Sequence, residues 1–142
     1  METGYIKIII EEGKMPTVIA KPVNGDIRMS KNDIARLFNC FNQKIETNLR
    51  SIFNAHLLRE EDVSFTYRYI DKGVEKQIVY YSLEVLIFLS YRIATFEAKI
   101  FRQFTHSALR EHLQKKDDRK NIIQLRYTFN QKFFKNQQYR LN

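Results

Sequence analysis

The chain has 142 residues, a mass of 17.1 kDa and a formal net charge of +8. That length suits one domain with an appendage and is too short for two ordinary domains. Cys40 is the single cysteine, which excludes an internal disulfide and argues against a cysteine-based zinc site. No apolar run approaches the ~20 residues of a membrane helix, and the first residues lack a secretory signal. We therefore expect a soluble, cytoplasmic protein with an acidic partner and no membrane partner.

The basic excess is concentrated at the carboxyl end. Residues 119–142 hold six basic residues and no acidic residue, whereas residues 1–118 are nearly balanced in charge. This contrast predicts a folded domain over residues 1–118 and a basic, aromatic-rich helical tail over residues 119–142. All the glycines and prolines lie within the first 73 residues, which predicts a mixed first half and a helical second half.

Three strands are predicted near the amino end. Residues 5–10 and 17–22 have the β-branched and apolar composition of strands. Asn24-Gly25 is a strong hairpin signal, and it leads into a third strand at residues 27–29. We therefore expect the third strand to fold back on the second.

Two short amphipathic helices are predicted next. The first begins after the N-cap Ser30, with Asp33 in a capping box, and is interrupted at residues 39–42. The second spans residues 42–53. Apolar side chains recur at three- and four-residue spacing in both helices. They are Ile34, Leu37 and Phe38 in the first helix, and Ile45, Leu49, Ile52 and Phe53 in the second.

The second half begins with another predicted hairpin. Residues 63–70 alternate between apolar and polar side chains, and residues 77–81 return after a glycine-containing turn. Ser82 is the predicted N-cap of a helix that bends or breaks at residues 93–95. A long amphipathic helix then reaches about residue 116. The expected core faces of these two helices are Leu83, Leu86 and Ile87, and then Phe96, Ile100, Phe104, Ala108 and Leu113.

Residues 30–53 match a helix-turn-helix, because a polar break separates the helices and small or apolar residues, Ala35 and Ile45, occupy the expected crossing. In that motif the second helix lies in the major groove of duplex DNA. Gln and Asn can form paired hydrogen bonds to adenine, and Arg and Lys to guanine, while hydroxyl and ammonium groups also bind phosphate. The predicted contacts of this motif are Lys31, Gln43, Lys44, Thr47, Asn48, Arg50 and Ser51.

The hairpin after this motif is placed like the wing of a winged helix, and its predicted contacts are Arg68, Lys72 and Lys76. The alternative is that both features are ordinary solvated surface, because two short amphipathic helices with a polar turn occur in many α+β proteins. Glu46 favours this alternative, since a carboxylate near phosphate is repelled unless it accepts from cytosine. We predict one α+β domain with N-terminal strands, a helix-turn-helix, a hairpin wing and a helical C-terminal half.

Several stretches between residues 28 and 113 occur in an order and spacing that together resemble a known family. They are MSKNDIARLF at 29–38, the segment 43–53, YYSLEVLI at 80–87, SYRI at 90–93, FRQF at 101–104 and LREHL at 109–113. This arrangement is similar to the RhuM-type virulence-associated family, which is related to phage-type Bro-N and KilA-N DNA-binding domains. The first two stretches resemble the two helices of its helix-turn-helix. Phe104 stands where the family has Trp, and the helix-compatible residues 94–100 replace a basic, glycine-containing link.

The resemblance implies a sequence-reading, double-stranded DNA-binding protein of a bacterial accessory or mobile-element locus, with a role in transcription regulation. No catalytic, metal or cofactor site is indicated by the residues themselves. His106 and His112 lie on different faces of the predicted long helix, whereas paired metal ligands need one face. Cys40 lies in the predicted turn, where a small buried side chain is expected rather than a nucleophile. We therefore expect no enzyme, no cofactor and no small-molecule substrate.

The tail admits two interpretations. Its aromatic residues are interleaved with basic ones, as in an arm that stacks on bases and contacts phosphates. Ile122, Leu125, Phe129 and Phe133 instead fall at helical spacing, which favours packing or a homodimer through the C-terminal helices. A dimer suits a helix-turn-helix, because two heads then bind two half-sites. The alternative function is a protein-interaction or oligomerisation module, an antitoxin-like partner that acts through these helices.

Overall fold

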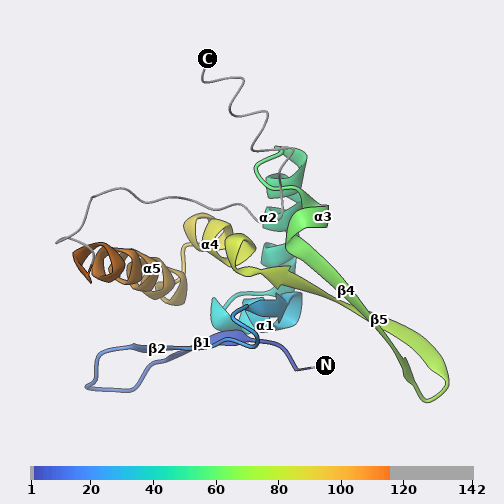
Figure 1. Cartoon of the computed structure of the whole chain (residues 1–142), viewed down its shortest axis with the longest axis horizontal. Coiled ribbons are helices and arrows are strands. Elements are labelled where there is room, and N and C mark those ends of the chain that lie inside the picture. The colour runs from blue at the N-terminus through green and yellow to red at the C-terminus, as the bar shows by residue number, and fades with distance from the viewer. Residues whose placement is uncertain (1, 116–142) are drawn as a thin grey trace. The chain divides into compact units, whose positions relative to one another are not determined.

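The computed structural model of the protein describes residues 2–115, so the predicted tail and its boundary at residue 118 lie outside the described residues. The chain divides into two units, Met1–Leu109 and Arg110–Asn142, and the described part of the second unit is the end of the last helix. The fold class is α+β, as predicted. The elements are β1 (Tyr5–Ile9), β2 (Thr17–Lys21), β3 (Arg28–Ser30), α1 (Lys31–Leu37), α2 (Asn42–Asn54), α3 (Glu60–Val63), β4 (Ser64–Asp71), β5 (Val74–Ser82), α4 (Leu83–Arg92) and α5 (Phe96–Lys115) (Figure 1).

The described strands form two antiparallel sheets, β1-β2 and β3-β5-β4. The Asn24-Gly25 turn forms as predicted, with both residues at positive φ (52° and 74°). A bridge between Val23 and Asp26 closes this turn. The expected pairing across the turn is wrong, because β3 does not pair with β2. Residues 28–30 pair instead with the end of β5.

The start of β1 explains why the chain leaves β2 after this turn. A Cβ atom on Gly4 would lie 2.1 Å from the carbonyl oxygen of Asp26, so the two backbones approach more closely than a side chain would allow. The Gly4 carbonyl also accepts a hydrogen bond from the Arg28 N–H at 3.0 Å. The segment after Asp26 is therefore held against the beginning of β1, and it continues into the second sheet.

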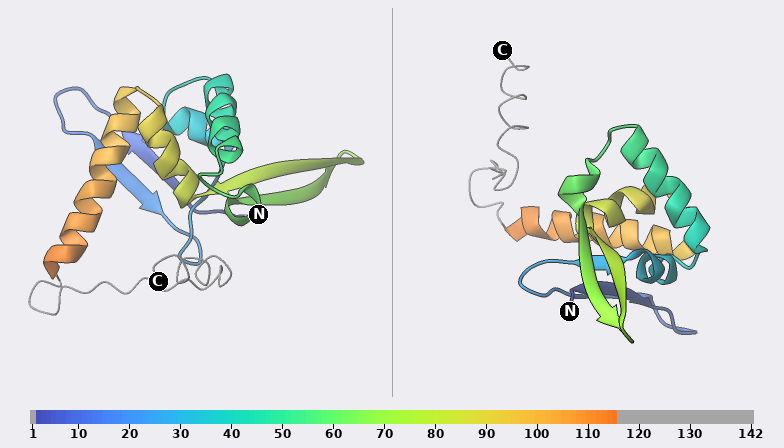
Figure 2. Two further views of the ribbon diagram at one scale, coloured as in Figure 1. Left: turned by 90° about the horizontal axis from the view of Figure 1, so that it is seen from above. Right: turned by 90° about the vertical axis from the view of Figure 1, so that its right-hand side faces the viewer.

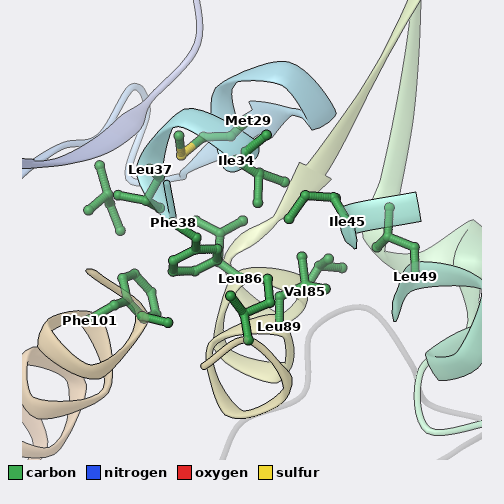
Figure 3. Close-up of a cluster of buried hydrophobic side chains, with 14 of the residues drawn as sticks. Met29, Ile34, Leu37, Phe38, Ile45, Leu49, Val85, Leu86, Leu89 and Phe101 are labelled. Carbon is green, nitrogen blue, oxygen red and sulfur yellow. The ribbon is translucent and has the colours of Figure 1, made fainter. Parts of the chain in front are cut away.

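A single cluster of apolar side chains joins α1, α2, α4 and the start of α5 (Figure 3). The stripes predicted for the first two helices are buried here, with Phe53 half-buried at the edge. Phe38 at the end of α1 meets Phe101 of α5 edge to face, with ring centroids 5.4 Å apart. The Thr95 hydroxyl donates to the Phe38 carbonyl at 2.7 Å and accepts from the Ala98 N–H at 3.2 Å. The carboxyl end of α1 is thereby tied to the beginning of α5.

The predicted core faces of the last two helices are partly wrong. In α4 the fully buried apolar residues are Val85, Leu86 and Leu89, whereas Leu83 is 37% exposed and Ile87 lies at the edge of the cluster. Six of the first seven side chains of α4 are apolar or aromatic and the other is Glu84, so the spacing of apolar residues does not indicate one face. In α5 only Ala98 and Phe101 are buried. The expected stripe of α5 fails because the helix contacts the core through its first turns, and it leaves Phe96 and Leu113 exposed.

The β4–β5 hairpin is confirmed and is longer than predicted. Lys72 and Gly73 have positive φ values of 52° and 78°, as in the tight two-residue turns that suit hairpin twist. β3 pairs only with residues 80–82, so the rest of the hairpin has no third strand. In both views of Figure 2 the hairpin extends past the helices of the first unit. No helix within residues 2–115 combines the length and the apolar composition that crossing a membrane requires.

Candidate nucleic-acid interface

The α1–α2 pair is built by a cap and a left-handed turn. The Ser30 hydroxyl accepts from the Asp33 N–H at 3.3 Å, which confirms Ser30 as the N-cap of α1. The Asp33 carboxylate accepts from Arg36, so the predicted capping box is formed in one direction. Asn39 has a φ of 52°, a conformation that asparagine tolerates better than most residues. The chain reverses over residues 38–41 and starts α2 with Ile45 fully buried at the crossing.

The outer face of α2 carries most of the contacts predicted from the sequence. Helical geometry places Gln43, Thr47 and Arg50 opposite the buried stripe of α2, with Lys44 and Ser51 on one flank. All five of these side chains are exposed. Neither Lys44 nor Arg50 forms an ion pair with any residue of the described chain. We define this set of five residues as the outer face of α2.

Asn48, another predicted contact, lies outside this set. Its side chain is only partly exposed, on the flank between the outer face and the buried stripe. The Asn48 amide donates to the Lys44 carbonyl at 2.9 Å, one turn back in the same helix. Its hydrogen-bonding capacity is therefore partly used within α2, and it is a weaker candidate for reading a base than Gln43.

Lys31 and Glu46 neutralise each other across the two helices. The Lys31 ammonium donates to the Glu46 carboxylate and forms an ion pair with it. The hydrogen bond from Lys31, helped by its charge, holds the pKa of Glu46 below its usual value. Repulsion between Glu46 and phosphate, which argued against this surface, is therefore reduced because Lys31 compensates the charge of the carboxylate. The ion pair also removes Lys31 as an uncompensated cation for phosphate.

Arg92 of α4 lies beside the outer face of α2 and was not predicted as a contact. It lies in the last turn of α4, and its guanidinium donates to the Ser51 hydroxyl at 3.0 Å. Arg92 and Ser51 are 41 residues apart, so no local pattern could have indicated their contact. The SYRI stretch that contains Arg92 indicates only a family resemblance. The structure thus adds a third cation beside the flank formed by Lys44 and Ser51.

The three predicted wing contacts are not brought together. Arg68 pairs in register with Gln77, and Lys76 with Tyr69, so Arg68 and Lys76 lie on opposite faces of the hairpin. Lys76 forms an ion pair with Asp71 at 2.8 Å, and Lys72 lies in the turn. Only Arg68 shares a face with Tyr81, at the base of the hairpin.

The face of the hairpin that carries Arg68 is the face toward α2. Tyr81 packs against the buried cluster to which α2 contributes, and burial, with the charges of Glu60 and Glu46, raises its pKa. Met29, which is paired with Tyr81, belongs to the buried cluster. The opposite face carries the stacked rings of Tyr67 and Tyr69, with centroids 5.9 Å apart. Arg68 is therefore the wing residue best placed to act together with α2.

The described residues include the histidines and the cysteine that were considered as candidate ligands in the sequence. Within residues 2–115, no three His, Cys, Asp or Glu side chains lie close enough together to hold a metal ion. The Tyr91 hydroxyl lies 2.5 Å from the Nε2 atom of His106, so this histidine links α4 to α5. Burial raises the pKa of the Cys40 thiol despite the opposing charge of Lys44. Comparison of the chain with protein-family models, curated proteins and solved structures gives no match.

Proposed function

We propose that this chain binds duplex DNA with α2 in the major groove and reads its sequence. The observation that carries the proposal is the outer face of α2, where exposed hydrogen-bonding side chains accompany Lys44 and Arg50, two cations without an ion-pair partner among the described residues. A carboxylate partner would weaken attraction to phosphate, so unpaired cations are the arrangement that phosphate binding needs. The resemblance to the RhuM-type family supports the same function.

The dimensions of α2 suit this role. Its 13 residues give a rod about 20 Å long and, with side chains, about 10–12 Å wide, close to the ~12 Å width of the major groove. In this arrangement Gln43 offers both a donor and an acceptor to a base edge, as adenine requires. Lys44, Arg50 and Arg92 neutralise phosphates on the groove walls. Arg68 contacts the adjoining backbone from the hairpin.

Lys31 and Lys76 are secondary in this proposal, because each is already paired with a carboxylate. We further propose a regulatory role at a bacterial accessory or mobile-element locus, which follows from the family resemblance. The proposed homodimer depends on the tail, which lies outside the described residues.

A protein-interaction module is the second candidate, and one observation favours it. Leu109 and Leu113 on α5 are 58% and 45% exposed. Exposed leucines one turn apart on a helix are typical of a surface that packs against a partner. In that case α5 rather than α2 would carry the function, and duplex DNA would not be bound.

A mobility-shift experiment on the full chain separates the two candidates. Duplexes with a random central segment are selected for binding, and the enriched sequences are measured at two salt concentrations. The DNA proposal expects a defined sequence preference and an affinity that falls steeply as salt rises. The absence of any shift at low salt would reject it in favour of the interaction module.

Charge-matched variants test whether α2 is the surface that binds. Lys44→Ala combined with Arg50→Ala should weaken binding and reduce the salt slope by about 2, because each substitution leaves one phosphate without its cation. Lys7→Ala combined with Lys21→Ala lowers the net charge equally on β1 and β2, where both lysines are exposed. Equal losses in the two double variants would show general attraction by charge and would reject α2 as the binding element.

A further inference from the structure

Phe41 is a large aromatic side chain that the fold leaves in solvent. It occupies the N-cap position of α2 and is 87% exposed, whereas Phe38 and Ile45 on either side are fully buried. Its side chain makes no capping hydrogen bond and takes no part in the buried cluster. An apolar ring held at the beginning of the helix proposed to enter DNA is therefore available for contact with a ligand.

Amide side chains, and no carboxylate of the described residues, line a hollow beside Phe41. A shallow hollow at the α1–α2 turn is lined by Asn32, Arg36, Asn39, Phe41, Asn42 and Gln43, and no Asp or Glu of the described chain lines it. The first turn of α2 also contains no acidic residue. The hollow therefore presents hydrogen-bonding groups and an apolar ring, and no carboxylate of residues 2–115 lies in its lining.

The polar groups of this hollow differ in how strongly they are bonded within the chain. The Asn42 amide donates to the Asn32 side chain at 2.5 Å, and the Asn39 amide contacts Glu97 at 3.5 Å. Arg36 donates to Asp33 at 3.3 Å. Gln43 makes only a long contact of 3.4 Å with Thr47. Asn39 and Gln43 are therefore the least engaged amides of the hollow, and of these two only Gln43 lies on α2, two positions after the Phe41 ring.

An apolar ring beside a free amide matches the chemistry of an A·T step. In the major groove thymine is the base that presents a methyl group, and adenine presents the N6 donor and N7 acceptor that a glutamine amide can bind. A phosphate offers no apolar group to contact the ring, and a G·C pair presents no methyl group in the major groove. The ligand that uses both groups is therefore a step that contains thymine and adenine.

We propose that Phe41 is a specificity-determining residue that contacts the C5-methyl group of a thymine, in the step whose adenine is bound by Gln43. This inference rests on the proposed function, since it needs α2 in the major groove. It goes further by naming the base group that is read and the residue that reads it.

The test replaces thymine by uracil, which removes the methyl group and leaves base pairing unchanged. In a selected duplex each thymine is replaced in turn, and dissociation constants are measured by fluorescence anisotropy. Burial of one methyl group corresponds to roughly a fourfold change in affinity. We expect one uracil position to weaken binding of the parent chain by about this factor.

Variants assign the effect to Phe41. Phe41→Ala should bind the thymine and uracil duplexes equally, while Phe41→Leu keeps an apolar contact and retains part of the difference. Met15→Ala is the matched control, because Met15 is also 87% exposed but lies in the β1–β2 loop. It should retain the full discrimination. Circular dichroism of each variant verifies that the chain is folded, as expected for substitutions at exposed positions.

The outcomes distinguish this inference from the proposed function. Sequence-selective binding with no uracil-sensitive position would overturn the inference and leave the proposed function in place. Discrimination that persists in Phe41→Ala would overturn the assignment to Phe41, and binding without any sequence preference would do the same. Failure of the chain to bind duplex DNA under any condition would overturn both.

Discussion

The outer face of α2 and the tip of the β4–β5 hairpin both carry basic side chains, yet they differ in how the charge is balanced. On α2, Lys44 and Arg50 have no ion-pair partner within residues 2–115, and Glu46 is compensated by Lys31. At the hairpin tip Lys76 is paired with Asp71, and Arg68 lies on the other face. The comparison teaches that the number of cations is a poor guide to a polyanion site, and that their pairing and direction matter more.

The largest expected effect tests whether α2 depends on the common core. Phe38→Ala should lower the free energy of unfolding by about 3–5 kcal/mol, because Phe38 is fully buried and packs on Phe101. Urea denaturation followed by circular dichroism measures this loss. Phe41→Ala, which removes the same side chain from an exposed position, should change it by less than about 0.5 kcal/mol. Similar losses in the two variants would contradict the described burial.

A pair of hairpin variants sharpens the contrast within the wing. Arg68→Ala should reduce the salt slope of DNA binding by about 1, because an unpaired cation on the face toward α2 is removed. Lys76→Ala removes the same charge, but Asp71 already compensates it, so the slope should change less. Measurement of affinity over a range of salt concentrations compares them. A larger effect of Lys76→Ala would place the DNA on the opposite face of the hairpin.

The N-cap of α1 is expected to matter moderately. Ser30→Ala removes the acceptor of the Asp33 N–H and should lower the free energy of unfolding by about 1 kcal/mol. Because α1 packs against α2, this loss of stability affects the helices that position the outer face of α2 and not the hairpin tip. Ser107→Ala, at an exposed position within α5, is the control and should change stability little. Equal changes would show that the Ser30 cap contributes nothing.

The smallest effect concerns the Lys31–Glu46 pair. Lys31 lowers the pKa of Glu46, so the pair stabilises the fold above the ordinary pKa of a glutamate, and this contribution is lost as pH falls through the lowered pKa. Glu46→Gln should therefore lower stability slightly at neutral pH and not at strongly acidic pH. It should also strengthen DNA binding, because Lys31 is released.

A second background controls this prediction. In a Lys31→Ala chain, Glu46→Gln should change the pH dependence of unfolding much less, because Lys31, the main group that lowers the pKa of Glu46, is absent and only the smaller effect of the Arg50 charge remains. Denaturation measured across the acid range would show this. An undiminished pH-dependent difference in the Lys31→Ala background would show that Lys31 is not the main group that lowers the pKa of Glu46.

The spacing of apolar residues predicted the buried side correctly in helices that bury a single face. It failed for helices whose burial does not follow one continuous stripe. The stripe of Ile45, Leu49 and Ile52 identified both the core side of α2 and, by exclusion, its outer face. Helix α4 is apolar nearly all round, so spacing could not select Val85 over Leu83. The route of β3 into the second sheet depends on the close approach at Gly4, which no local pattern records.

The sequence could predict those parts of the candidate site that lie within one helix or one hairpin. The Lys76–Asp71 pair could have been inferred from the hairpin register, since the two residues lie diagonally across its end. The contacts of Lys31 with Glu46 and of Arg92 with Ser51 arise from tertiary packing and could not. Phe41 carried no signal of its exposure, because it lies four residues before Ile45 and so continues the spacing of the buried stripe of α2.

The uneven strand pairing of β5 has a consequence for motion along the hairpin. Only Tyr80 and Tyr81 have a strand on each side, and nearer the tip β5 is paired with β4 alone. A two-stranded ribbon is marginally stable by itself, so backbone amides should exchange with deuterium slowly at the base and progressively faster outward. Arg68 would then lie on a flexible hairpin that can adapt to a curved surface, while α2 stays packed on the core.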